Sequence, residues 1–305
     1  MNILELHGLS KRFGAQRVLD DLTLSVPEGS VFGFVGQNGS GKTTTMKIVL
    51  GLLEADSGSI TICGEPVHYG NTKTNRHIGY LPDVPEFYSY MRPYEYLSLC
   101  GKISGLSKAA TKERSDELLS LVGLEGVKKR IGGFSRGMKQ RLGIAQALLA
   151  RPKLLICDEP TSALDPVGRK EILDILRKVK GSTTVLFSTH ILNDVERICD
   201  HVAVLHGGNI TMSGTLQQMK SLHRRNSLFL EFLSADELKQ FKADARIKPL
   251  LASADAGETE VVLHGADMRR IQATAIAALA QTGLCPIKME IVEPTLESLF
   301  LEVVQ

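Results

Sequence analysis

Short apolar runs and alternating apolar and polar positions mark the strands expected in the first part of the chain. Residues 22–26 alternate apolar and polar side chains, and residues 31–35 form an almost continuous apolar run. The first pattern indicates a half-buried strand and the second a buried one. Residues 3–35 as a whole predict several short strands separated by turns. Further strands are expected at residues 59–63, 78–81, 154–157, 184–188 and 202–205.

Apolar residues at helical spacing occupy the stretches between these strands. The expected helices cover residues 43–53, 93–101, 108–122, 136–150, 167–178 and 192–199. Consecutive helices between about residues 84 and 150 indicate a helical subdomain. Elsewhere strands alternate with helices, which favours an α/β fold with a largely parallel sheet covered by helices.

The pattern changes after residues 219–226, a run that contains two consecutive arginines. We therefore expect a first domain over residues 1–220 and a small α+β domain over residues 227–305. The elements expected in the second domain alternate from strand to helix and cover residues 227–233, 235–243, 258–263, 268–282, 286–292 and 295–303.

Composition and charge narrow the classes of protein that fit this fold. The chain has 305 residues, is 43% hydrophobic and 23% charged, and carries a formal net charge of +2. A charge so close to neutral gives no reason to expect a nucleic-acid partner. Five scattered cysteines without a CxxC pair indicate reduced thiols in a cytosolic protein. We find neither a signal-peptide pattern nor an apolar run long enough to span a membrane. If the protein works at a membrane, we expect another polypeptide to supply the membrane-spanning part.

A glycine-rich loop joins the apolar run at 31–35 to the helix predicted at 43–53. Its spacing is that of the GxxxxGK[ST] P-loop in the expected strand–loop–helix setting. Lys42 would reach the β- and γ-phosphates of ATP, and the Thr43 hydroxyl would ligate Mg²⁺. The residues expected to bind the nucleotide are Gly36, Gln37, Asn38, Gly39, Ser40, Gly41, Lys42, Thr43 and Thr44.

Two acids end the apolar run at 154–157. A P-loop enzyme holds Mg²⁺ through a carboxylate at this place, and Asp158 is expected to supply it. Glu159 is the expected general base for the attacking water. His190 follows the strand predicted at 184–188. A lone histidine is more often structural than catalytic, but the end of a core strand in a P-loop sheet also suits a sensor of the γ-phosphate.

In this order, over roughly residues 3–220, the motifs resemble the nucleotide-binding cassette of ABC transporters. Residues 36–43 match Walker A, residues 154–158 match Walker B, and residues 162–165 match the D-loop. The resemblance implies a P-loop NTPase fold of the ABC cassette type with a helical subdomain. It also makes Glu159 the catalytic glutamate and His190 the switch histidine.

The resemblance assigns further residues to the ATP site. Phe13 stands where the family places an aromatic ring on adenine, and Ser135 and Gly137 belong to the signature motif. Ser135 can cap the helix predicted at 136–150, which offers an anion-binding helix end. In the family this end closes on the ATP of another cassette, which implies a dimer, most simply a homodimer.

The chain departs from the family pattern at two positions. The family usually has Gln after the strand that matches residues 78–81, whereas this chain has Asp83. A carboxylate can still approach Mg²⁺ and water, so we expect Asp83 among the catalytic and metal-binding residues. In the signature motif, Arg136 could favour a phosphate or face solvent, and we favour solvent.

The resemblance is to bacterial cassettes that serve a separate transmembrane permease. The tail over residues 292–300 is similar to the end of the C-terminal domain in an exporter branch that handles drugs, antimicrobial peptides, polysaccharides or lipids. We expect an ATP-hydrolysing subunit held by its permease at the cytoplasmic face of the cell membrane. The C-terminal domain is expected to regulate or to stabilise the dimer. The alternatives are an importer cassette and a soluble ABC ATPase that acts on ribosomes or DNA.

Aromatic residues follow Asp83 closely. Tyr88, Tyr90, Met91 and Tyr94 stand where the family forms its groove for a cytoplasmic helix of the permease. Aromatic and methionine side chains suit an interface. Packing inside the helical subdomain is the equal alternative.

Overall fold

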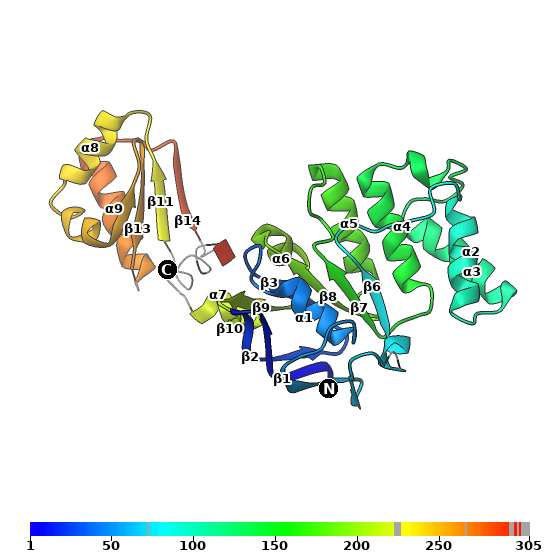
Figure 1. Cartoon of the computed structure of the whole chain (residues 1–305). Coiled ribbons are helices and arrows are strands. Elements are labelled where there is room, and N and C mark those ends of the chain that lie inside the picture. The colour runs from blue at the N-terminus through cyan, green and yellow to red at the C-terminus, as the bar shows by residue number, and fades with distance from the viewer. Residues whose placement is uncertain (72, 223–226, 266, 293–295, 298, 300–305) are drawn as a thin grey trace. The chain divides into compact units, whose positions relative to one another are not determined.

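A computed structural model describes the chain except for residues 72, 223–226, 266, 293–295, 298 and 300–305. The chain divides into two compact units, Met1–Leu216 and Gln217–Gln305 (Figure 1). Most of the predicted helix at 295–303, much of the tail at 292–300 and part of the boundary run at 219–226 lie outside the described residues.

The central sheet of the first unit is built from short strands, and its four inner strands are buried. The strands of this sheet are β3 (Val31–Val35), β6 (Ile78–Leu81), β7 (Leu154–Asp158), β8 (Thr184–Thr189), β9 (His201–His206) and β10 (Asn209–Thr215). The order is β10-β9-β3-β8-β7-β6, and every neighbouring pair is parallel except β10 with β9. This confirms the predicted parallel sheet. Val35 pairs with Thr189 and Asp158 with Ser188, so β3, β7 and β8 end at one edge, where ligands bind in sheets of this type.

A second, antiparallel sheet corrects the prediction for residues 3–35. Instead of several short strands, the chain forms a hairpin of two long ones, β1 (Asn2–Phe13) and β2 (Gln16–Pro27). Register shifts lie on both sides of Leu9, so irregularities that suggested turns are bulges within continuous strands. The strands β4 (Ser57–Ile62) and β5 (Glu65–Pro66) complete the order β2-β1-β4-β5.

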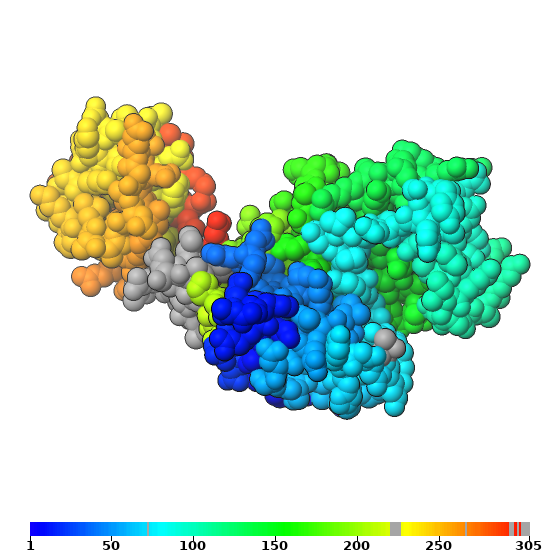
Figure 2. All heavy atoms as spheres, in the orientation of Figure 1, coloured from blue at the N-terminus to red at the C-terminus, as the bar shows by residue number. Residues whose placement is uncertain are grey.

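The helices of the first unit follow the predicted order. They are α1 (Lys42–Val49), α2 (Pro93–Ile103), α3 (Lys108–Leu121), α4 (Arg136–Leu148), α5 (Pro166–Val179) and α6 (Leu192–Ile198). α1 ends before the predicted residue 53, and Gly51 follows with a φ of 68°. In the space-filling view, the cyan region around α2 lies at the surface of the unit (Figure 2).

The core of the first unit lies between its two sheets. Met46 of α1 packs there with Leu4 of β1, Phe34 of β3 and Ile156 of β7, all of them buried. The helix that begins in the P-loop is therefore fixed by side chains from both sheets. None of the described helices combines the length and the hydrophobicity that crossing a bilayer demands.

The second unit has a core of its own. Its strands are β11 (Ser227–Glu231), β12 (Ala254–Ala256), β13 (Glu260–His264) and β14 (Lys288–Val292), in the antiparallel order β12-β13-β11-β14. The helices α8 (Ala235–Ala243) and α9 (Met268–Thr282) pack Phe241 and Ala275 against Leu230 and Val261 of the sheet. The short helix α7 (Leu216–Leu222) precedes these elements.

Candidate functional site

The P-loop connects β3 to α1 with backbone conformations that only glycine adopts easily. Gly41, directly before α1, has a φ of 111°, and a Cβ atom there would lie 2.7 Å from Cδ2 of Leu19. A Cβ atom on Gly36 would lie 2.5 Å from Oγ of Ser40 and 2.7 Å from the carbonyl oxygen of Leu205. Close packing therefore requires glycine at residue 36, and the left-handed backbone conformation requires it at residue 41.

Lys42 is the buried cation of the loop. Its Nζ donates hydrogen bonds to the carbonyl oxygens of Gly36, at 2.7 Å, and Gln37, at 3.1 Å. It also lies 3.2 Å from Oε1 of Glu159. A buried ammonium group needs such partners, because burial without them is costly. Lys42 thus ties the P-loop to the acid that follows β7.

Asp158, at the end of β7, is buried and accepts two hydrogen bonds. Oγ1 of Thr43 donates to its Oδ2 at 2.8 Å, and Oγ of Ser188 donates to its Oδ1 at 2.7 Å. The hydroxyl of Ser188 in turn accepts the backbone N–H of Glu159 at 3.0 Å. Sequence reasoning missed Ser188, which fixes the carboxylate of one acid and the backbone of the next.

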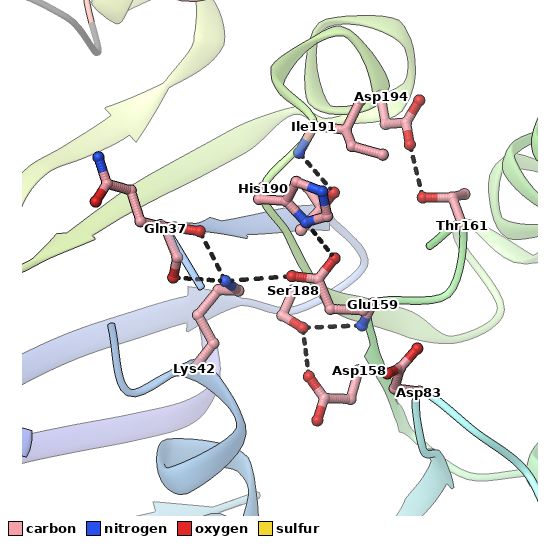
Figure 3. A network of polar contacts seen from close by, with 12 residues as sticks. Gln37, Lys42, Asp83, Asp158, Glu159, Thr161, Ser188, His190, Ile191 and Asp194 are labelled. Atoms are coloured by element: carbon pink, nitrogen blue, oxygen red, sulfur yellow. Dashed lines mark hydrogen bonds and ion pairs between the residues drawn. The ribbon is translucent and has the colours of Figure 1, made fainter. Parts of the chain in front are cut away.

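Glu159 stands between two basic side chains. Lys42 faces its Oε1, and Nδ1 of His190 lies 2.9 Å from its Oε2. Figure 3 shows both side chains converging on the carboxylate. The residue is almost fully buried and has a φ of 46°, a left-handed conformation that is uncommon outside glycine. The prediction that Glu159 and His190 share one site is consistent with this geometry.

A second hydrogen bond joins the segments that carry Glu159 and His190. Oγ1 of Thr161 donates to Oδ2 of Asp194 at 2.7 Å, and both residues are buried (Figure 3). Burial raises the pKa of Asp194, and the hydroxyl of Thr161 opposes this effect. This pair also escaped sequence reasoning, since neither residue belongs to a motif used above.

Asp83 follows β6 and contacts the signature helix α4. Nη2 of Arg136 lies 3.2 Å from Oδ1 of Asp83, and Nε2 of Gln140 donates to its carbonyl oxygen at 2.6 Å. We predicted that Arg136 faces solvent. Its side chain is half exposed, but it also forms an ion pair with Asp83, which the prediction did not include. Burial raises the pKa of Asp83, with a lowering contribution from Arg136.

A cavity of about 340 Å³ brings most of the predicted residues together. Its lining consists of Asn38, Gly39, Gly41, Lys42, Thr43, Thr44, Asp83, Glu159, Ser162 and His190. Behind that lining, Gly36 and Gln37 are bonded to Lys42, and Asp158 is bonded to Thr43.

The predicted residues that do not line this cavity are Gly36, Gln37, Ser40 and Asp158 of the adjoining P-loop and β7, and Phe13, Ser135 and Gly137. Phe13, at the end of β1, is half exposed, and Nζ of Lys11 lies 5.6 Å from the centre of its ring. Ser135 and Gly137 lie at the start of α4, where Oγ of Ser135 accepts the backbone N–H of Met138 at 3.3 Å. Their expected roles in ATP binding stay predictions.

The chemistry of the cavity fits an anionic nucleotide and a hard cation. Lys42 supplies a positive charge. The space beside Gly39 is open, because a Cβ atom built there would meet nothing within 4 Å, so a phosphate can approach the backbone of the loop. The hydroxyl of Ser40 is buried without a hydrogen-bond partner among the described residues. Thr43 and Asp158 present adjacent oxygen atoms, the ligand type that Mg²⁺ prefers.

Removal of the Ser188 hydroxyl should weaken the whole unit. In Ser188→Ala, Oδ1 of Asp158 and the N–H of Glu159 lose a buried partner, so the free energy of unfolding should fall by about 1–3 kcal/mol. Denaturant titration measures this change. Ser120→Ala is the matched control, because Ser120 is exposed on α3 and should shift the value by about 0.5 kcal/mol or less. Equal effects of the two substitutions would contradict the role given to Ser188.

Known proteins share both the sequence and the fold of this unit. The sequence profile of the ABC transporter family matches residues 19–162. The ABC transporter ATP-binding protein YxlF of Bacillus subtilis is 46% identical over 73% of this chain and 75% of its own length. The bacitracin transport ATP-binding protein BcrA of Bacillus licheniformis is 41% identical over 78% of this chain and 76% of its own length.

A solved ATP-binding subunit of an ABC transporter has the same fold. It superposes with a TM-score of 0.65 and 36% sequence identity, and the match covers 72% of this chain and 92% of that subunit. The expected ABC cassette fold is therefore confirmed. Since the residues matched by the family profile contain the P-loop and the acids after β7, and the relatives are ATP-binding subunits, this chain belongs to the ATP-binding subunits of ABC transporters and hydrolyses ATP to drive transport.

Proposed function

We propose that this subunit powers a separate permease that exports an antimicrobial peptide or another drug. The relation to the bacitracin transport ATP-binding protein carries this proposal. The resemblance of the signature segment to cassettes with a detached permease supports the same conclusion. The subunit would then work at the cytoplasmic face of the cell membrane, held there by the permease.

The geometry of the cavity supports distinct roles for its charged residues. Lys42 would exchange the carbonyl oxygens of Gly36 and Gln37 for the β- and γ-phosphates of ATP. Glu159 would take the proton of the attacking water, because its carboxylate opens into the same cavity. His190 would orient Glu159 through the contact at Nδ1 and sense the γ-phosphate.

Magnesium fits the oxygen atoms at the end of β7. Thr43 would ligate the ion directly, Asp158 would hold it through water, and Asp83, which lines the same cavity, would approach it from the end of β6. Bound Mg²⁺ supplies positive charge at the phosphate oxygens. Ser188 keeps the carboxylate of Asp158 oriented for this task.

A second copy of the chain would complete the site. Ser135 is exposed at the N-terminus of α4 and does not line the cavity of its own subunit. The free end of α4 is therefore suited to an anion presented from outside, such as the γ-phosphate held by a second copy. We propose a homodimer with two ATP molecules between the copies.

The surface beyond Asp83 is the proposed docking site for the permease. Tyr88, Tyr90 and Tyr94 are exposed, which favours an interface over packing inside the helical subdomain. A cavity of about 480 Å³ next to them has a mixed lining, in which the apolar side chains of Phe87 and Ile131 stand beside charged ones such as Glu86.

Deletion of the gene should make the host more sensitive to bacitracin or to another membrane-active antimicrobial. Growth inhibition across a panel of such compounds measures this effect, and a plasmid copy of the wild-type gene should reverse it. A Glu159→Gln copy at the same protein level should not. Export is contradicted if sensitivity never changes and uptake of a solute falls instead.

A further inference from the structure

Two side chains of α4 hold residue 83 in place. Arg136 and Gln140 are four residues apart and therefore lie one above the other on one face of the helix. Arg136 pairs with the carboxylate of Asp83 at 3.2 Å, and Gln140 bonds its backbone carbonyl oxygen at 2.6 Å. The segment after β6 is thus attached to the signature helix at two points, one of which is charged.

Asp83 also lies between two cavities. It lines the nucleotide cavity with Lys42 and Glu159, and it lines the larger cavity with Arg136 and Lys139. Its carboxylate can therefore face either α4 or the ATP site. Gln140 is fully buried, so the backbone of residue 83 stays anchored while the side chain changes direction.

The ion pair between Arg136 and Asp83 is weak enough to separate. The side chains of Arg136 and Asp83 are 43% and 46% exposed, and ion pairs so accessible to water are weak. The attraction of Arg136 for the carboxylate also competes with any cation bound near Thr43 and Asp158. One negative charge cannot serve both fully.

We propose that Arg136 is a positioning residue for Asp83: it holds the carboxylate on the signature helix until the metal ion of the ATP site draws it away. The proposal rests on the metal-binding role proposed above for Asp83. It connects two departures from the family pattern, an acid in place of glutamine and an arginine in the signature motif. In this chain the two residues act as a pair.

The size of the effect follows from the weakness of the pair. In exposed ion pairs, the paired state is favoured over the separated state by about 1.4- to 5-fold. The carboxylate of Asp83 is then separated from Arg136 for about 15–40% of the time. Removal of Arg136 makes it free at all times. The apparent affinity for the metal ion should then rise by about 2- to 6-fold.

A double-mutant cycle with Mn²⁺ tests this proposal. Wild type, Arg136→Gln, Asp83→Asn and the double variant are each titrated with Mn²⁺ in the presence of a non-hydrolysable ATP analogue, and electron paramagnetic resonance reports free Mn²⁺. Arg136→Gln should tighten Mn²⁺ binding by about 2- to 6-fold when residue 83 is Asp and leave it unchanged when residue 83 is Asn. Asp83→Asn alone should weaken it.

Control variants separate positioning from the general loss of a positive charge. Lys139→Gln removes a cation that lines the same cavity and is not bonded to Asp83 in the described residues, so its effect should not depend on residue 83. Arg136→Lys keeps the charge and should behave like wild type. Circular dichroism and analogue binding check that each variant folds, and Arg136→Ala, which keeps a high helix propensity, replaces Arg136→Gln if the latter does not.

Two outcomes would overturn the proposal. If Arg136→Gln tightens Mn²⁺ binding equally with Asp and with Asn at residue 83, then Arg136 acts only by direct electrostatic repulsion of the cation. No tightening at all, or Mn²⁺ binding that ignores Asp83→Asn, would mean that the pair does not control the metal site. This test measures metal binding and not hydrolysis. It can therefore fail while the proposed role of Glu159 stands, and the role of Glu159 can fail while this test succeeds.

Discussion

Glu159→Gln is expected to lower the steady-state ATPase rate by about 10²- to 10⁴-fold and to leave ATP binding close to that of wild type. The amide has nearly the same shape as the carboxylate, so it can still occupy the space between Lys42 and His190. It cannot accept the proton of the attacking water. Phosphate release measures the rate, and calorimetry measures ATP affinity.

The same variant should accumulate as a dimer when ATP is present. Without hydrolysis, two copies that share two ATP molecules have no route to separate, and light scattering after size exclusion should show twice the monomer mass. Glu113→Gln is the matched control, because Glu113 is exposed on α3 and should leave the rate unchanged. A wild-type rate in Glu159→Gln would exclude Glu159 as the general base.

Lys42→Ala is expected to weaken ATP binding by about 10- to 150-fold, the range for loss of a hydrogen bond to a charged group. Lys42 is buried and already aligned by the carbonyl oxygens of Gly36 and Gln37, so little ordering is needed before it meets a phosphate. Titration calorimetry with ATP, with and without Mg²⁺, measures the loss.

A control on the same helix separates charge from position. Lys47→Ala removes an exposed lysine of α1, and its effect on ATP affinity should be small. Thermal unfolding of the nucleotide-free variants shows whether the loop itself still folds. Unchanged ATP affinity in Lys42→Ala would exclude the P-loop as the phosphate site.

Local pattern was sufficient for the elements that carry the motifs. The short strands β3 and β6 are bounded by glycine, proline and polar residues, and their observed ends coincide with the predicted ones. The P-loop and the acids after β7 were recognisable because their chemistry fixes residue type and spacing. Helix ends were less certain, as α1 shows, because tertiary packing decides where the last turn stops.

Contacts between distant segments lay beyond the sequence pattern. Ser188 is 30 residues from Asp158, and Asp83 is 53 residues from Arg136. Each pair meets only because of the order of strands in the central sheet and the packing of α4 beside β6. Periodicity describes which face of an element is buried, but it does not say which side chain lies opposite.

The left-handed backbone of Glu159 has a consequence for how this protein can be improved. A non-glycine residue in this conformation carries a local strain of about 1–3 kcal/mol, which is retained where function requires it. Glycine at this position would relieve the strain and remove the carboxylate in one step. The same substitution would leave the buried ammonium group of Lys42 without its carboxylate partner, so relief of the strain carries a cost in stability as well as in activity, and a thermostabilised version should be sought at positions remote from residue 159.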